Sequence, residues 1–242
     1  MRVAILSDIH ANREALDAIL AHAAERGRDA LWVAGDLVGY GPDPDAVVER
    51  LEGLGAICVM GNHDAATCGL LPLGDFNENA AAAVRWTQEH ASETTRAYLA
   101  ALPEVRREGD FTIVHGTLRQ PLWEYMSTIA VAEAHLRLQE TPYSVVGHTH
   151  HQVIAGLRDG RLDHQSPGDD ESFALGAGPL VINPGGAGQP RDRDVRVGYA
   201  LLDLEARNVQ FFRVPYDIPA TQRRMREVGL PELLAARLGV GR

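Results

Sequence analysis

The stretch Leu31-Trp32-Val33-Ala34-Gly35-Asp36 joins a short apolar run to a carboxylate. The run ends abruptly and is followed by the turn-forming residues Gly39-Tyr40-Gly41-Pro42. The pattern therefore predicts a buried strand that delivers Asp36 to a loop. A single carboxylate at the end of a strand is common and says little about function. Asp36 becomes a candidate functional residue because other apolar runs of this chain end in a similar way.

Four further apolar runs end in residue types that bind metals. In open α/β sheets, ligands bind beyond the carboxyl ends of the strands. We therefore expect the polar side chains at these ends to converge, with Asp36 as their shared centre. The four runs are Val3–Ser7 before Asp8 and His10, Ile57–Met60 before Gly61-Asn62-His63-Asp64, Phe111–Val114 before His115, and Ser144–Val146 before Gly147-His148-Thr149-His150.

Helical patterns separate the expected strands in the first part of the chain. Strands that alternate with helices up to residue 150 predict parallel strands with helices outside them. Asn12 and Asp45 are expected to cap the first two helices. The expected helices run from Asn12 to Gly27, from Asp45 to Gly55, from about Glu78 to Ala101 with a break near Ser92, and through residues 131–138.

The chain after residue 150 is richer in strands. This change predicts a second sheet packed on the first, so the expected fold class is α/β, a four-layer α/β/β/α sandwich of two mixed β-sheets flanked by helices. The length favours a single domain over residues 1–242. The expected elements are a hairpin of Gln152–Leu157 and Arg161–Asp163 around Asp159-Gly160, a strand at Pro179–Ile182, a hairpin of Val197–Asp203 and Val209–Val214, and a helix at about 220–238 broken at Pro231.

Composition excludes several functions. The formal net charge is −10, which argues against a wide basic face for nucleic acid, so no nucleic-acid partner is expected. All 23 basic residues are arginine, and this removes a Walker lysine, a Schiff-base lysine and a lysine general base. No G-x-S-x-G elbow is present, which argues against a typical serine hydrolase.

The cysteines and the apolar segments bear on the cellular compartment. Cys58 and Cys68 show no C-x-x-C spacing, and two free thiols fit a reducing environment. The apolar run after Met1 is too short for a signal-peptide core. No apolar stretch approaches the ~18 residues that a membrane span needs. We expect a cytoplasmic protein with no membrane contact.

The side chains expected at the strand ends suit a metal site better than a structural role. Asp8 and His10, like His148 and His150, are two residues apart, which puts each pair on one face of an extended segment. A lone Asp-x-His would favour a structural or capping role. Two carboxylates, one amide and four imidazoles would be costly to bury together without a bound ion. A two-metal site accounts for all of them.

The motifs of residues 1–150, in their order along the chain, resemble the calcineurin-like metallophosphoesterase family. The sandwich architecture of that family agrees with the expected sheets. The resemblance implies two divalent ions, with Mn, Fe or Zn expected from the mixed nitrogen and oxygen ligands. It also implies that one metal is held by Asp8, His10, Asp36 and His150, and the other by Asp36, Asn62, His115 and His148.

The resemblance further implies the hydrolysis of phosphate esters by a hydroxide held between the two metals. Such a centre keeps a positive charge that attracts phosphate. His63 would protonate the leaving alkoxide and Asp64 would orient its imidazole, the alternative being a histidine that only supports the ligands. A solvated or supporting role is expected for His151.

A glycine-rich loop, Asn183–Arg191, follows the strand at Pro179–Ile182. Backbone amides could approach an anion there, although a plain loop fits the pattern equally well. The resemblance places this loop near the active site, with Arg191 as the candidate phosphate contact. Asn12 is a second candidate contact, while helix capping is its simpler role.

One departure narrows the expected substrate. Phosphoprotein phosphatases of this superfamily carry Gly-Asp-x-Val-Asp-Arg-Gly, whereas this chain has Gly35-Asp36-Leu37-Val38-Gly39-Tyr40-Gly41, without the arginine. We therefore expect a small phosphorylated substrate, most simply a phosphodiester or a nucleotide-type molecule. The alternatives are a metal-dependent nuclease and a non-catalytic metal-binding scaffold. The sequence does not set the oligomeric state.

Overall fold

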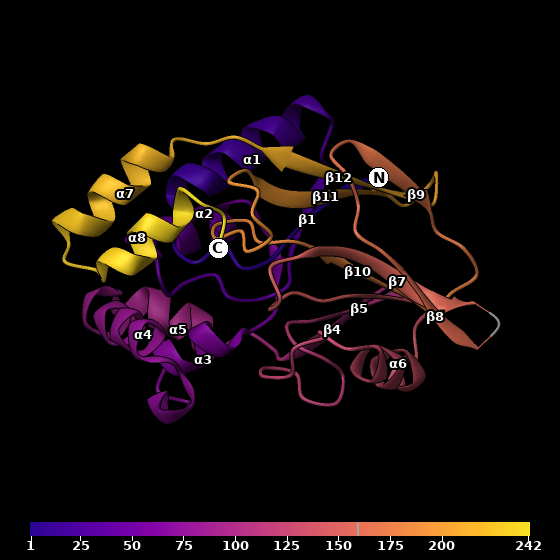
Figure 1. The fold of residues 1–242 in the computed structure, drawn as a ribbon, viewed down its shortest axis with the longest axis horizontal. Helices are drawn as coiled ribbons and strands as arrows, with labels where there is room; N and C mark the ends of the chain where they lie inside the picture. Colours follow the sequence, from indigo (N-terminus) through magenta and orange to yellow (C-terminus); the bar gives the residue numbers. More distant parts are fainter. Residues whose placement is uncertain (159) are drawn as a thin grey trace.

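The protein is described by a computed structural model that covers residues 1–242 except Asp159. In this described part, two six-stranded mixed sheets pack face to face between layers of helices (Figure 1). The expected α/β/β/α sandwich is confirmed. In spatial order, the first sheet consists of β3 (Ile57–Cys58), β2 (Ala30–Val33), β1 (Arg2–Leu6), β11 (Val197–Asp203), β12 (Asn208–Val214) and β9 (Glu171–Ala174). The second consists of β4 (Val105–Glu108), β5 (Phe111–Val114), β6 (Tyr143–Val145), β10 (Leu180–Pro184), β7 (Gln152–Arg158) and β8 (Arg161–Gln165).

Three apolar layers hold the sandwich together. Helices α1 (Arg13–Glu25) and α2 (Pro44–Gly53) pack on the first sheet through side chains such as Leu16 and Val47. Ile5, Phe211 and Ile113 belong to the layer between the sheets. Helix α6 (Ile129–Leu138) covers the second sheet through Leu136. Each layer buries the apolar face of its elements, which is the main favourable term in folding.

The remaining helices gather at one end of the sandwich. They are α3 (Asn62–Thr67), α4 (Glu78–His90), α5 (Glu93–Ala100), α7 (Ile218–Glu227) and α8 (Glu232–Leu238), drawn on the left of Figure 1. An apolar cluster joins Ala83 of α4, Met225 of α7 and Leu234 of α8 to Tyr40. Thr221 of α7 also donates a hydrogen bond to Asn12. The C-terminal helices therefore pack beside the loop that follows β2.

The strands before residue 150 divide between the two sheets. β1, β2 and β3 run parallel in the first sheet, whereas β5 and β6 run parallel with β10 in the second. Strand β11 pairs with the free side of β1, so β5 and β6 begin a new sheet. Their carboxyl ends still reach the same edge as those of the first sheet.

Two strands, β4 and β9, were not expected from the sequence. β4 reads Val-Arg-Arg-Glu and β9 reads Glu-Ser-Phe-Ala, and both lie at the edge of a sheet with mostly exposed side chains. Such strands lack the apolar alternation that marks a half-buried strand. They form because their backbones pair with β5 and β12, respectively.

Helix boundaries match the expectations except at α2 and α3. Asn12 caps α1 as expected, and Ser92 caps α5. Asp45 does not cap α2, because Pro44 takes the first helical position and Asp43 therefore occupies the capping position. The Asp45 carboxylate instead accepts the backbone N–H of Ser92 at 2.9 Å. Helix α3, which begins at Asn62, was not expected.

The expected hairpins and the broken C-terminal helix are confirmed. β7 pairs with β8 and β11 with β12, in both cases antiparallel. Asp159, in the turn expected between β7 and β8, lies outside the described residues. Helix α7 ends at Glu227 and α8 begins at Glu232, directly after Pro231. Over the described residues, every helix is too short or too polar to cross a membrane.

Candidate metal centre

The structure brings together the seven side chains expected to bind metal. They come from the loops after strands of both sheets, and each residue is at most 3% exposed. The convergence expected from the strand ends is therefore present. The seven residues are Asp8, His10, Asp36, Asn62, His115, His148 and His150.

Backbone strain is concentrated in these ligand loops. Five of the seven residues have positive φ values, in the left-handed region that side chains other than glycine rarely adopt. Such a conformation costs about 1–2 kcal/mol per residue, and it is maintained by hydrogen bonds between loops, such as Asp8 N–H to Gly35 O at 3.0 Å. The five φ values are 56° for Asp8, 50° for His10, 54° for Asp36, 64° for His148 and 61° for His150.

Two glycines let the loops approach each other closely. A Cβ atom on Gly61 would lie 2.1 Å from Oδ1 of Asp36, and one on Gly147 would lie 1.8 Å from Oγ of Ser7. Both separations are shorter than van der Waals contact allows. Any side chain at either position would force the ligand loops apart.

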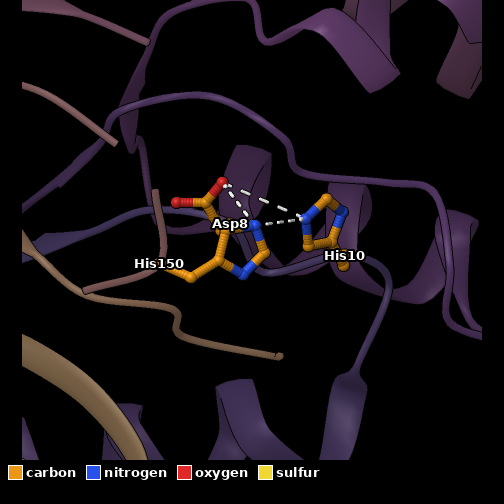
Figure 2. A group of neighbouring side chains, drawn as sticks. All are labelled: Asp8, His10 and His150. Atoms are coloured by element: carbon orange, nitrogen blue, oxygen red, sulfur yellow. Dashed lines mark hydrogen bonds and ion pairs between the residues drawn. The ribbon is translucent and has the colours of Figure 1, made fainter. Parts of the chain in front are cut away.

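The first group of ligand atoms consists of Asp8, His10 and His150 (Figure 2). Nε2 of His150 lies 3.2 Å from Oδ1 of Asp8 and 3.3 Å from Nε2 of His10. Oδ2 of Asp36 lies 3.6 Å from Nε2 of His10. The ligand atoms of Asp8, His10 and His150 therefore lie close together, and Asp36 approaches them beside His10.

The second group surrounds Nε2 of His115. Nδ1 of His148 and Oδ1 of Asn62 each lie 3.1 Å from this nitrogen. Oδ2 of Asp36 lies 3.4 Å from it. The same oxygen of Asp36 thus faces both groups.

The outer nitrogens of the four imidazoles fix their tautomers. Each lies within hydrogen-bond distance of a backbone carbonyl oxygen, which can only accept, so each of these nitrogens carries a proton and donates it. The inner nitrogen of a neutral ring then presents a lone pair to the centre. The pairs are His10 Nδ1 with Val38 O at 3.1 Å, His115 Nδ1 with Ala34 O at 2.8 Å, His148 Nε2 with Trp123 O at 3.2 Å, and His150 Nδ1 with Gln189 O at 2.5 Å.

The electrostatics of the site fit a bound cation. Burial lowers the pKa values of His10, His148 and His150 well below their ordinary value, so these rings are neutral. Burial also raises the pKa of Asp8 to about 7 and that of Asp36 well above its ordinary value. Within the described chain, Oδ1 of Asp8 has no hydrogen-bond partner. A divalent cation would stabilise the ionised carboxylates that burial disfavours and would accept the lone pairs of the neutral rings, so the site suits such ions.

His63 lies beside the two groups, with one ring nitrogen within 4.8 Å of ligand atoms of both His10 and Asp36. Its ring centroid is 4.9 Å from that of His10, and the residue is 4% exposed. Burial, followed by the positive charge of Arg191, lowers the pKa of His63 well below its ordinary value. Nδ1 of His63 has no hydrogen-bond partner among the described residues. Because Nδ1 is buried against Gly39, a contact with a bound molecule would fall to Nε2.

Among the described residues, the carboxylate of Asp64 makes no hydrogen bond to the imidazole of His63, in contrast to the orienting role expected for it. Its carboxylate accepts the backbone N–H groups of Val38 at 3.1 Å and Gly61 at 2.9 Å. The reason lies in helix α3, where consecutive residues project in different directions and do not face each other. Asp64 instead fixes the start of α3 on the loop after β2.

The two candidate phosphate contacts differ in their surroundings. Asn12 accepts the N–H of Ala15 at 3.2 Å and donates to Gly188 O at 2.8 Å, so its polar atoms serve the cap and the glycine-rich loop. Arg191 is half-buried and donates only to a neutral acceptor, Oε1 of Gln189, among the hydrogen bonds of the described residues. Its positive charge is thus left to act on the centre.

Several features of the site gave no usable signal in the sequence. The four supporting carbonyl groups belong to Ala34, Val38, Trp123 and Gln189, and every residue type carries a carbonyl. His151 is exposed, with Nε2 3.1 Å from Arg191 O, which agrees with the solvated role expected for it. Trp123 and Tyr125 follow β5 in a mostly polar segment, and aromatic residues there were the one signal that could have drawn attention to the mouth of the site.

The fold and the ligand atoms define a phosphoesterase, a hydrolase that acts on phosphate esters. The chain belongs to the calcineurin-like phosphoesterase superfamily, whose domain matches residues 1–207. The crystal structure of a metallophosphoesterase from Sphaerobacter thermophilus is similar to it, with 42% identity and a TM-score of 0.90 over 100% of this chain and 99% of that one.

Two further relatives are similar in sequence. An uncharacterised protein of Methanocaldococcus jannaschii is 31% identical over 99% of this chain and 98% of its own length. A symmetrical bis(5'-nucleosyl)-tetraphosphatase of Nitrosococcus oceani is 37% identical over 114 residues, which are 44% of this chain and 38% of that protein.

Proposed function

We propose that each of the two groups holds one divalent metal ion and that the centre hydrolyses phosphodiesters or nucleotide-type phosphate esters. The supporting observation is Oδ2 of Asp36, which lies 3.6 Å from Nε2 of His10 and 3.4 Å from Nε2 of His115. A single oxygen that faces both groups suits a bridging ligand. The mixed imidazole, carboxylate and amide donors suit Mn, Fe or Zn.

The metals would lower the pKa of a bound water and attract the oxygens of the phosphoryl group. The remaining steps fall to side chains of this protein. Arg191 attracts the anionic ester, and His63 donates a proton to the leaving alkoxide. The negative charge of the ester opposes the effects that lower the pKa of His63, and so favours the protonated ring that this step requires. Asp64 positions His63 indirectly, through the start of α3.

Two observations favour a diester or a nucleotide over a phosphoprotein. The loop after β2 lacks an arginine, so it offers no guanidinium to the extra negative charge of a phosphomonoester. The relative in Nitrosococcus oceani is named as a nucleotide hydrolase, which supports the same substrate class. The net charge of −10 argues against a nuclease, because tracking along nucleic acid needs a basic face.

A substrate panel tests the proposed function. The protein is stripped of metal, reconstituted with Mn²⁺, Zn²⁺ or Fe²⁺, and assayed with phosphomonoesters, phosphodiesters, nucleotides and single-stranded nucleic acid. We expect two metals per chain and turnover of diesters or nucleotides. Turnover of nucleic acid alone would support the nuclease. Two bound metals without turnover of any substrate would support the non-catalytic scaffold.

The remaining expectations from the sequence stay proposals. A single domain over residues 1–242 fits the sheets, which share one apolar layer. A cytoplasmic location fits the two free cysteines, Cys58 and Cys68. No nucleic-acid partner is proposed.

A further inference from the structure

Aromatic rings surround His63 and His148 at the mouth of the candidate centre. Tyr40 lies 4.4 Å and Phe76 lies 5.1 Å from the ring of His63, measured between centroids. Trp123 extends this wall, with its ring 4.8 Å from that of Phe76. The rings come from the loop after β2, the segment before α4 and the segment between β5 and α6, so three separate parts of the chain build one aromatic wall.

Tyr125 is the exposed member of this set. Its ring stacks on the candidate ligand His148 with centroids 3.7 Å apart and an angle of 21° between the planes. Tyr125 is nevertheless 46% exposed, whereas Tyr40 is 6% exposed and only fills space beside His10 and His63. Exposed aromatic side chains beside a site are typical of binding surfaces, since they offer apolar area at a low entropic cost. Tyr125 therefore presents a planar surface directly beside the candidate ligand His148.

Two arginines, Arg191 and Arg237, lie near these rings. The guanidinium of Arg191 lies 5.8 Å from the centroid of the Tyr40 ring. Arg237 of α8 is near enough to Arg191 and Tyr125 for their charges to affect its pKa, which burial lowers. A molecule that fills this mouth would thus place an anionic group near the arginines and a planar group near the rings.

We propose that the ester bound at this centre carries a planar aromatic ring, either a nucleobase or a simple aryl group, which stacks on Tyr125 and borders on Trp123. The proposal rests on the phosphoesterase function proposed above and narrows its substrate class. Recognition of a ring by stacking tolerates different ring types, because every base or aryl group has a π face. Hydrogen bonds to one particular base are not required.

A purely structural role for the rings predicts a different result. If Tyr125 only supports His148, its loss lowers the turnover of all esters by the same factor. If it binds the substrate ring, its loss affects ring-bearing esters more. The informative quantity is therefore the ratio of kcat/KM for a ring-bearing ester to that for a ring-free ester, measured within each variant, because general damage to the centre cancels in it.

The test uses two pairs of diesters with alkoxide leaving groups on the metal-loaded protein. A dinucleoside monophosphate is compared with its abasic analogue, and dibenzyl phosphate with dibutyl phosphate. We expect a preference for the ring-bearing member of at least one pair by roughly 5- to 150-fold, the range that base–aromatic stacking provides. The first pair then identifies a nucleobase and the second an aryl group.

Variants of Tyr125 decide between the two roles. In Tyr125→Ala, the ratio of kcat/KM for the ring-bearing ester to that for the ring-free ester should fall toward 1. In the matched control Tyr125→Phe, which keeps the ring, this ratio should stay at its wild-type value. Calorimetry with benzylphosphonate and butylphosphonate, which are not hydrolysed, gives the same comparison as a ratio of dissociation constants. Equal kcat/KM values for both members of both pairs in the wild type, or an unchanged ratio in Tyr125→Ala, would overturn the proposal. Absence of turnover for every ester would instead count against the phosphoesterase function.

Discussion

Oδ1 of Asp36 accepts the backbone N–H of His63 at 2.9 Å. The other oxygen of the same carboxylate faces His10 and His115. One side chain therefore links the two groups of ligand atoms to the start of helix α3, which carries the candidate general acid. Because the two oxygens have separate partners, these two roles can be separated by substitution.

Asp36→Asn should abolish the binding of both metals while the start of α3 stays in place. The amide keeps an oxygen that can accept the N–H of His63 but loses the negative charge that both metals share. We expect less than one metal per chain by elemental analysis, with a circular dichroism spectrum like that of the metal-free wild type. Full occupancy by two metals in this variant would remove Asp36 from the centre.

Histidine substitutions should divide the ligands into two sets. His10→Ala and His150→Ala should each lose the metal of the first group, and His115→Ala and His148→Ala should each lose that of the second. Metal content and anomalous scattering from crystals of each variant measure the outcome. His151→Ala is the matched control, because this exposed neighbour of His150 points to Arg191 O and should keep both metals. A variant of the first set that loses only the second metal contradicts the assignment.

His63→Ala should separate metal binding from catalysis. Since the proposed assignment does not use His63 as a metal ligand, we expect the variant to keep two metals and to turn over diesters with alkoxide leaving groups roughly 10²- to 10⁴-fold more slowly. Nitrophenolate departs without a proton, so the loss should be smaller for nitrophenyl esters. Equal losses for both leaving groups, with chemistry rate-limiting, would assign His63 to substrate positioning and end its role as an acid.

His135 should make the fold sensitive to acid. Burial lowers the pKa of this histidine from 6.5 to about 4, while its ring accepts the N–H of Leu118 and contacts Oγ of Ser144 at 2.8 Å. The folded-state pKa lies below the unfolded value. The neutral ring of His135 therefore contributes its full share of the folding stability above pH 6.5, and this contribution is lost as the pH falls from there through about 4. The difference between the two pKa values corresponds to about 3 kcal/mol of unfolding free energy.

The test compares the unfolding free energy of the wild type and His135→Gln between pH 7 and pH 4. Glutamine can donate and accept hydrogen bonds without titrating, so the variant should lose less stability over this interval. His90→Gln, which changes an exposed histidine, is the matched control. The same pH slope in His135→Gln and in the wild type would assign the acid sensitivity to other groups.

The convergence of the candidate ligands could be predicted from the sequence because each of them follows a short apolar run. The runs before Asp8, Asp36 and His115 are buried strands, and their carboxyl ends meet at one edge by the geometry of the sheets. The division of these strands between two sheets was not predictable in the same way. It depends on β11 pairing with β1, a contact between residues about 200 positions apart along the chain.

The surroundings of the ligands were less predictable for two physical reasons. Backbone carbonyls orient all four imidazoles. Every residue type carries a backbone carbonyl, so the residue types do not indicate which carbonyls have this role. The resemblance implied that Asp64 orients His63, but the carboxylate bonds to two backbone N–H groups instead, because neighbouring residues of a helix do not face each other. The aromatic mouth combines Phe76 and Trp123, which only the folded chain brings together.

The positive φ values of the ligand loops have a consequence for evolution. At Asp8, Asp36 and His148, the backbone conformation would suit glycine better than the residue present. Selection for stability alone would therefore move these positions away from the proposed metal ligands, and selection for metal binding would oppose it. A lineage that no longer needed the reaction should drift to glycine at these positions first, and its sequence would record the loss of activity while the sandwich persists.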